Sequence, residues 1–411
     1  MCTKGSSSYA SSSFARARSA ARSRPNDPSF ARPFDDAAAA VRDDAPARWR
    51  CPACLRRGAR ERLRSERDAN CIDGGDEKRA AATYRCANGH ALDASASGYV
   101  NLFVGKRVRG DSRAQLRARR RFLVEGGHFG ALSEAVADAV LGRAADARDG
   151  DAELGLAVEL RSGGDAASTT ATSPRARRMA RKREARSEAR AANPNAANPN
   201  AASAKVKAKP LRVVDFGCGE GYYSSVVLER ARARDDVELE LAALDASKDA
   251  ADLCAAAIGR FARVAVADAT RDLPLDDDSV DVAMSVFAPR SPTELARVLR
   301  KGGRAVVASP DDDHMVELRD AFRDDDKITV LGVEPNKSTR VDEAFLAAGF
   351  DVVFRRAIRD VVPLPADAVA DLVFMGPSGF HNPESAIRDA VGDAPRVVTT
   401  SFNVVVYALL R

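Results

Sequence analysis

A glycine-rich segment with two acidic residues is the part of the sequence best suited to hold a nucleoside-containing ligand. It spans residues 213–221, and its three glycines are Gly217, Gly219 and Gly221. Glycines let the backbone turn sharply and approach a ligand without a side chain in the way. Dinucleotide-binding folds use a similar loop to place a pyrophosphate at a helix start. Asp215 and Glu220 would repel a pyrophosphate, whereas they suit a sulfonium ligand that also carries an amino group.

Two further carboxylates stand where the next two predicted strands end. Asp245 follows Leu244, and Asp268 follows Ala267. In a parallel α/β sheet, ligands bind beyond the carboxyl ends of the central strands. There the Asp245 carboxylate can accept hydrogen bonds from both ribose hydroxyls, and Asp268 is placed to accept one from an adenine amino group. Acids at three successive strand ends favour S-adenosylmethionine over a nicotinamide cofactor.

The spacing of three cysteines and a histidine near the N-terminus is typical of a structural zinc site. Two residues separate Cys51 from Cys54, and three separate Cys86 from His90. A tight turn brings the first two sulfurs to one side, so that both can bind one tetrahedral zinc ion. Either pair alone would equally fit a redox motif or free thiols, but together they predict a zinc ribbon. Cys71 is an alternative ligand, although the charged segment around it is expected to be a loop insertion.

These residues require a scaffold, and the pattern from residue 210 onward predicts one. Apolar runs of strand length cover residues 211–216, 237–244, 263–267, 280–288, 305–308, 350–354 and 402–409. Helical periodicity covers residues 293–299, 315–322 and 342–348. The alternation predicts an α/β fold over residues 210–411, a Rossmann-like, doubly wound parallel sheet with helices on both faces.

A basic helical connector, residues 106–143, is expected between the cysteine module, residues 49–105, and the sheet. A predicted turn at 98–102 leads toward a helix that begins near Ala114 and that Gly126 and Gly127 end. Phe129 lies at its exit. Five arginines of the helix cannot all face one side, so some are expected to contact phosphate and others water. They are Arg113, Arg117, Arg119, Arg120 and Arg121.

Two segments have the composition of chains that do not fold. Residues 1–48 are rich in Ser, Ala and Arg and poor in acids, which is typical of an organelle transit peptide. The Ser-rich start favours a chloroplast over a mitochondrion, and an unstructured basic tail is the alternative. Residues 144–209 contain a direct repeat and few large apolar side chains, so we expect a disordered insertion.

Composition limits the remaining classes. A chain of 411 residues with 45% hydrophobic content can bury an α/β core and a smaller module. No stretch approaches the roughly 20 consecutive apolar residues of a membrane-spanning helix, so a soluble chain without a membrane partner is expected. Seven cysteines in a chain of this length favour metal binding over a disulfide framework. The net charge of +5 is modest.

The order of these motifs resembles the bacterial 23S rRNA (guanine-N1)-methyltransferase family, within the class I S-adenosylmethionine-dependent methyltransferases. The resemblance covers about 49–132 and 211–411, and it includes the motifs at 98–102, 118–123, 127–129, 286–289 and 314–318. It implies methyl transfer to N1 of a guanine in a hairpin loop of large-subunit rRNA, with the zinc module facing the RNA. By the same resemblance the zinc ligands are Cys51, Cys54, Cys86 and His90. The implied cofactor contacts are Phe129, where the family commonly has tyrosine, Gly219, Glu220, Asp245, Asp268 and His314.

The sequence leaves the general base unassigned. Guanine N1 carries a proton that must leave, so a base is wanted near residues 285–289, where no carboxylate stands; Asp281 precedes this loop and Glu294 follows it. Phe287 is either a stacking platform for an extruded base or a core aromatic. Two alternatives remain, a small-molecule methyltransferase of the quinone or sterol type and a non-catalytic ribosome-assembly factor. Pairing of two copies into a homodimer is also left open.

Overall fold

The computed structural model describes residues 49–67, 82–103, 110–142, 209–323 and 325–411. Residues Met1–Leu154 and Pro210–Arg411 belong to one compact unit, which contains nearly all of the described residues. A second unit, Gly155–Lys209, lies outside them apart from Lys209. The predicted transit segment, most of the predicted insertion and Cys71 therefore also lie outside the described residues.

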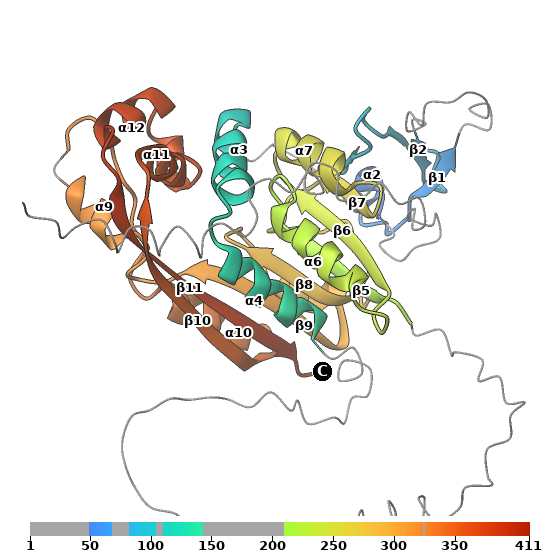
Figure 1. Ribbon diagram of the computed structural model, residues 1–411. Helices are drawn as coiled ribbons and strands as arrows, with labels where there is room; N and C mark the ends of the chain where they lie inside the picture. The colour runs from blue at the N-terminus through green and yellow to red at the C-terminus, as the bar shows by residue number, and fades with distance from the viewer. Residues whose placement is uncertain (1–48, 68–81, 104–109, 143–208, 324) are drawn as a thin grey trace, which may run out of the picture. The chain divides into compact units, whose positions relative to one another are not determined.

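The core of the described unit is an eight-stranded sheet, in which β5 occupies a central position (Figure 1). Its strands are β4 (Val100–Asn101), β5 (Leu211–Phe216), β6 (Leu239–Asp245), β7 (Ala262–Val266), β8 (Val280–Val286), β9 (Leu299–Pro310), β10 (Phe350–Leu364) and β11 (Arg396–Leu409). Their order across the sheet is β10-β11-β9-β8-β5-β6-β7-β4. The order reverses direction between β5 and β8, so the glycine loop after β5 lies at the switch point, where α/β sheets bind ligands.

The sheet is mixed, which corrects the expectation of parallel strands throughout. The pairs from β4 to β9 are parallel, but β11 runs antiparallel to both β9 and β10. β11 lies between β9 and β10, both of which precede it in the chain. The connection from β10 to β11 contains the helices α11 (Ala366–Phe374) and α12 (Glu384–Val391). Its long register with β10, from Phe350↔Leu409 to Leu364↔Arg396, closes this side of the sheet.

Helices cover both faces of the sheet, as the alternating pattern predicts. One face carries α4 (Gly130–Leu141), α6 (Tyr222–Arg232) and α7 (Lys248–Ile258), and the other carries α8 (Pro292–Val298) and α10 (Lys337–Ala347); Figure 1 shows α4 and α6 in front of the sheet and α10 behind it. Further helical segments of this unit are α3 (Arg113–Arg120), α9 (Val316–Ala321) and the short segments η2 (Arg121–Glu125) and η3 (Pro377–Phe380). α11 packs on α3 and on α12. No described helix is long and apolar enough to cross a membrane.

The N-terminal module is a small sheet that shares the core of the larger one. It consists of α2 (Pro52–Leu55) and the antiparallel strands β1 (Arg64–Arg67), β2 (Ala82–Arg85) and β3 (Ala91–Asp93). The segment between the cysteine pairs is thus not all loop, because both of its ends form strands. Trp49 is 2% exposed and belongs to the same apolar cluster as Phe216 and Leu244 of the large sheet. The module therefore packs as part of the same hydrophobic core as the large sheet.

Two local expectations need correction and one is confirmed. The predicted turn at 98–102 contains β4, which pairs with β7 and extends the sheet by one edge strand. The helix from Arg113 changes to a π-helical turn over Arg121–Glu125, where the Gly126 amide donates to the Arg121 carbonyl at 2.8 Å. It ends at Gly126, as predicted, and Phe129 then starts α4 in a left-handed conformation (φ 62°).

Candidate functional site

The glycine loop has the close-packed geometry that only glycine allows. Gly217, Gly219 and Gly221 have φ values of 81°, 56° and 90°. A Cβ on Gly217 would lie 2.2 Å from the Cβ of Ala288, the residue that follows Phe287 after β8. The Gly217 amide also donates to the Leu244 carbonyl at 2.8 Å. The loop is therefore held between the ends of β6 and β8, with its backbone exposed to the switch point.

Asp245 at the end of β6 fixes this loop directly. Its two oxygens accept the Gly219 amide at 2.9 Å and the Ser247 amide at 2.8 Å. Burial raises the pKa of Asp245, while these two backbone donors act to lower it. Each carboxylate oxygen can accept a second hydrogen bond, so the residue can hold the loop and two ligand hydroxyls together.

The other two strand-end acids are more fully engaged by the protein itself. Asp215 is 2% exposed and accepts the Ser224 hydroxyl at 2.7 Å; burial raises its pKa to about 7. Asp268 lies just beyond β7, where it accepts the Thr270 amide at 2.9 Å and the Arg271 guanidinium at 2.9 Å. Burial opposes ionisation of Asp268, but these donors outweigh it and lower the pKa. Asp215 is thus buried beneath the loop, and Asp268 keeps its negative charge near the carboxyl end of β7.

Glu220 is the residue of the loop whose buried carboxylate has unused hydrogen-bond acceptors. It is 7% exposed, and neither carboxylate oxygen has a hydrogen-bond partner in the described residues. Burial is the main reason that its pKa is raised. A buried carboxylate without partners costs free energy. The ammonium group at the amino-acid end of S-adenosylmethionine would supply the missing donors, so the loop fits this cofactor.

Phe129 and His314 meet beside the loop, although 185 positions separate them in the sequence. Their ring centroids lie 6.2 Å apart, and Phe402 of β11 contacts both, at 4.7 Å each. Phe402 in turn lies 5.4 Å from Phe287, whose ring lies 6.2 Å from Tyr223 at the start of α6. An aromatic wall therefore runs from the glycine loop to His314.

His314 is held neutral within this wall. Its Nδ1 accepts the Ser401 amide at 3.2 Å, so the ring proton resides on Nε2. Burial lowers the pKa of His314 to about 4, with the charge of Arg319 adding to the effect. At neutral pH the side chain can therefore donate a hydrogen bond to a ligand, but it carries no charge.

Neither carboxylate near the β8 loop is available as a base. Asp281 accepts the Arg212 amide at 2.7 Å, and it also pairs with the Arg212 and Arg300 guanidinium groups. Glu294 pairs with Arg297 at 2.9 Å and accepts the Leu273 amide. These bonds lower both pKa values in spite of burial. Asp281 thus holds neighbouring strands together and Glu294 holds α8 to the loop before β8, in agreement with leaving the base unassigned.

Sequence reasoning missed Phe402 and the role of Arg119. Phe402 lies in a strand pattern and carries no signal of its own. The sequence treats Arg119 as one of five surface arginines, yet its guanidinium pairs with Asp111 at 2.6 Å and lies 3.6 Å from Glu220. Arg121 likewise pairs with Asp371 at 2.6 Å. Two of the five arginines, Arg119 and Arg121, therefore form ion pairs within the fold.

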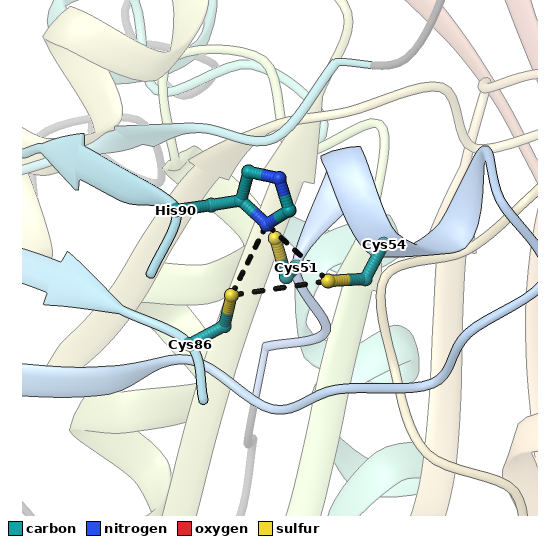
Figure 2. A group of neighbouring side chains, drawn as sticks. All are labelled: Cys51, Cys54, Cys86 and His90. Carbon is teal, nitrogen blue, oxygen red and sulfur yellow. Dashed lines mark hydrogen bonds between the residues drawn. The ribbon is translucent and has the colours of Figure 1, made fainter. Parts of the chain in front are cut away.

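The four predicted metal ligands converge on one point (Figure 2). The Cys54 and Cys86 sulfurs lie 3.8 Å apart, and His90 Nδ1 lies 3.4 and 3.3 Å from them. Cys51 completes a set of ligand atoms that all lie within 4.8 Å of one another. Tetrahedral zinc with Zn–S bonds of about 2.3 Å places two sulfurs roughly 3.8 Å apart. The donor set and its spacing fit such an ion.

The thiols of this cluster differ in acidity because their surroundings differ. Burial raises the pKa of Cys51 to about 11. Burial acts in the same direction on Cys86, but hydrogen bonds from His90 and nearby backbone amides prevail and lower its pKa to about 7. Asn88 donates to the Cys54 sulfur at 3.3 Å. A bound cation would favour the thiolate form of the Cys51 and Cys86 side chains, because a coordinating thiol loses its proton.

The strand order, the glycine loop at the switch point and the acids at successive strand ends define a class I S-adenosylmethionine-dependent methyltransferase. A family model described as "Methyltransferase domain" matches residues 213–303, which include the glycine loop, Asp245 and Asp268. The chain is 30% identical over 322 residues to the 23S rRNA (guanine(748)-N(1))-methyltransferase of Streptomyces fradiae. The match covers 78% of this chain and 89% of that enzyme. The chain therefore belongs to the 23S rRNA (guanine-N1)-methyltransferase family.

A second relative extends the same relation. A protein of Micromonospora griseorubida with the provisional name 23S rRNA (guanine-N(1)-)-methyltransferase is 30% identical over 318 residues. That match covers 77% of this chain and 86% of the relative. Both matches are far longer than the 213–303 segment, so they extend well beyond the cofactor-binding part of the domain.

Proposed function

We propose that this protein transfers a methyl group from S-adenosylmethionine to N1 of a guanine in a hairpin loop of large-subunit rRNA. The observation that carries the proposal is the length of the family match, 322 residues, because it extends far beyond the segment that methyltransferases of all substrates share. Relatives that share only the cofactor-binding segment would support the small-molecule alternative equally well. The intact glycine loop and its acids argue against a non-catalytic assembly factor.

We further propose that the Cys51, Cys54, Cys86 and His90 cluster holds a structural zinc ion and that its module faces the RNA. A hollow of about 650 Å³ lies beside the cluster and is lined by five arginines and three acids. The arginines are Arg50, Arg60, Arg62, Arg64 and Arg85, and the acids are Glu61, Asp276 and Asp277. Arg50 pairs with Asp276 at 2.8 Å, and this ion pair joins the N-terminal module to the turn before β8. The excess of positive charge suits a phosphate backbone.

The residues of the site mainly position the reactants. S-adenosylmethionine supplies an already activated methyl group, so in-line placement of the guanine provides much of the rate. His314 has its proton on Nε2 and suits a hydrogen-bond acceptor on a ligand. The N1 proton of guanine must leave, and its acceptor stays unassigned, because no carboxylate stands in the described loop 285–289 and water is available to take the proton.

Phe287 is proposed to stack on the extruded guanine. It is 41% exposed in spite of its apolar ring, and it adopts a left-handed backbone conformation (φ 55°) directly after β8. Its amide donates to the Ala308 carbonyl at 3.0 Å, and the Arg290 guanidinium grips the next carbonyl, that of Ala288, at 2.8 Å. A strained, exposed aromatic held this firmly is typical of a functional position.

Replacing Phe287 by Ala is expected to lower kcat/KM for RNA methylation about 5- to 150-fold, the equivalent of 1–3 kcal/mol of base stacking. Affinity for S-adenosylmethionine, measured by calorimetry, should change little. Phe287→Tyr keeps a stacking ring and serves as the matched control with near-normal kcat/KM. Equal losses in the Ala and Tyr variants would show that the ring packs for the fold and does not stack on the base.

The substrate and the location are tested together by mapping methylated guanine in cells that lack the protein. We propose that residues 1–48 direct the chain to an organelle, with the chloroplast favoured. Mass spectrometry of plastid, mitochondrial and cytosolic rRNA should show loss of one 1-methylguanosine in organelle large-subunit rRNA, restored by the full-length gene. A loss confined to cytosolic rRNA would refute the targeting proposal alone. Unchanged rRNA in all three compartments would favour a small-molecule substrate.

A further inference from the structure

Arg119 lies directly on the glycine loop, although it comes from a helix outside the sheet. Ser112 caps this helix, α3, through a reciprocal pair of hydrogen bonds with Gln115. The Arg119 side chain is 22% exposed, and a Cβ on Gly219 would lie 3.1 Å from its Nη1. The guanidinium therefore occupies the space that a larger residue in the loop would need.

Two neighbours hold the guanidinium in this place through the same nitrogen. Nη2 donates to Asp111 Oδ2 at 2.6 Å and to the Met375 carbonyl at 2.9 Å. Asp111 immediately precedes the cap of α3, and Met375 ends α11, so two separate elements orient the group. Nη1 makes no hydrogen bond in the described residues and points toward Glu220, whose Oε2 lies 3.6 Å away.

A distance of 3.6 Å is too long for a hydrogen bond. Glu220 therefore keeps two buried oxygens without a donor, and Arg119 keeps the donors of Nη1. A guanidinium and a carboxylate, each with hydrogen-bonding atoms that have no partner in the described residues, thus lie side by side over the loop. Their natural complement is a ligand that carries one ammonium and one carboxylate group close together.

We infer that Arg119 binds the carboxylate of the amino-acid end of S-adenosylmethionine, while Glu220 receives its ammonium group. The inference rests on the methyltransferase activity and adds a binding residue that the sequence places among surface arginines. Because the bonds of Nη2 to Asp111 and Met375 hold the guanidinium in place, its Nη1 can donate to the ligand carboxylate from a fixed position. The pair selects the whole zwitterion, so adenine nucleosides without the amino-acid end gain nothing from it.

The test combines removal of the guanidinium with removal of the ligand carboxylate. Arg119→Met keeps the apolar stem of the side chain and removes its charge. Calorimetry on the full chain should show that this variant binds S-adenosylmethionine about 10- to 100-fold more weakly, the range for hydrogen bonds to charged groups. Decarboxylated S-adenosylmethionine should bind the variant and the wild type within about threefold of each other. Arg117→Met, which removes an exposed arginine of the same helix, should change neither affinity.

The two ligands separate a binding role from a structural one. A variant that loses affinity for both ligands equally would show that Arg119 only supports the loop and α3, and the inference would fall. Wild-type protein that binds both ligands with the same affinity would also overturn it. Failure of the folded wild type to bind S-adenosylmethionine at all would instead refute the cofactor assignment on which the proposed function depends.

Discussion

Asp245→Ala is expected to weaken S-adenosylmethionine binding by about 1–3 kcal/mol, or roughly 5- to 150-fold in Kd. The carboxylate accepts the Gly219 amide at 2.9 Å and the Ser247 amide at 2.8 Å, so it joins the glycine loop to the start of α7. Its remaining acceptor capacity is available to the ribose hydroxyls of the bound cofactor. The alanine variant therefore loses both the ligand contact and the restraint on the loop. Calorimetry with S-adenosylhomocysteine gives the affinity without turnover.

Two comparisons show which of these losses dominates. Asp249→Ala removes a half-exposed carboxylate from the start of the same helix and should leave Kd unchanged. An analogue of S-adenosylhomocysteine without the 2′-hydroxyl should bind the wild type more weakly than S-adenosylhomocysteine does. The Asp245→Ala substitution should weaken binding of this analogue less than it weakens binding of S-adenosylhomocysteine. If Asp245→Ala binds S-adenosylhomocysteine as tightly as wild type does, the ribose is held elsewhere and the assignment of Asp245 is wrong.

The glycine loop and the strand-end acids were predictable because their signals are local. β5 has the expected bounds, Leu211–Phe216, since a buried parallel strand is a continuous apolar run that the loop glycines end. Asp245 and the strand before it follow the same rule. The four zinc-type ligands were predictable because metal chemistry fixes both residue type and spacing.

Elements whose partners are distant in the sequence were predicted less well. β10 was expected to end at 354, but it continues to Leu364 through a charged stretch whose side chains are mostly exposed. The backbone hydrogen-bonding groups of β10 pair with β11, as at Ile358↔Phe402. Such backbone pairing does not require an apolar pattern in the sequence. The direction of β11 was likewise invisible, because a connection through α11 and α12 fits either orientation.

Residues that act through neighbours were missed for the same reason. Arg119 looks like one member of a basic helix, and only the fold brings it to 3.6 Å from Glu220. Phe402 reads as an ordinary strand residue, although its ring lies 4.7 Å from both Phe129 and His314. Sequence motifs thus identify residues that contact a ligand through fixed spacing, whereas the groups that orient them depend on tertiary structure.

Cys54→Ser is expected to abolish stoichiometric zinc binding and to destabilise the catalytic domain as well as the small module. Cys54 is 1% exposed, and its sulfur lies 3.8 Å from the Cys86 sulfur and 3.4 Å from His90 Nδ1. Structural zinc sites contribute about 10–16 kcal/mol of apparent binding free energy in zinc-finger peptides at neutral pH. Elemental analysis should give close to one zinc per wild-type chain and close to none for the variant.

The wider destabilisation follows from the shared core. Cys51 and Cys54 pack in one apolar cluster with Val214 and Phe216 of β5, the strand that carries the glycine loop. Loss of even about 2 kcal/mol lowers Tm by roughly 4–8 °C in a domain of this size, and thermal unfolding of wild type and variant measures the change. Cys71→Ser is the matched control and should keep both its zinc and its Tm. Zinc retained by Cys54→Ser and lost by Cys71→Ser would move one ligand of the site to Cys71, whereas a folded wild type without metal would refute the zinc assignment.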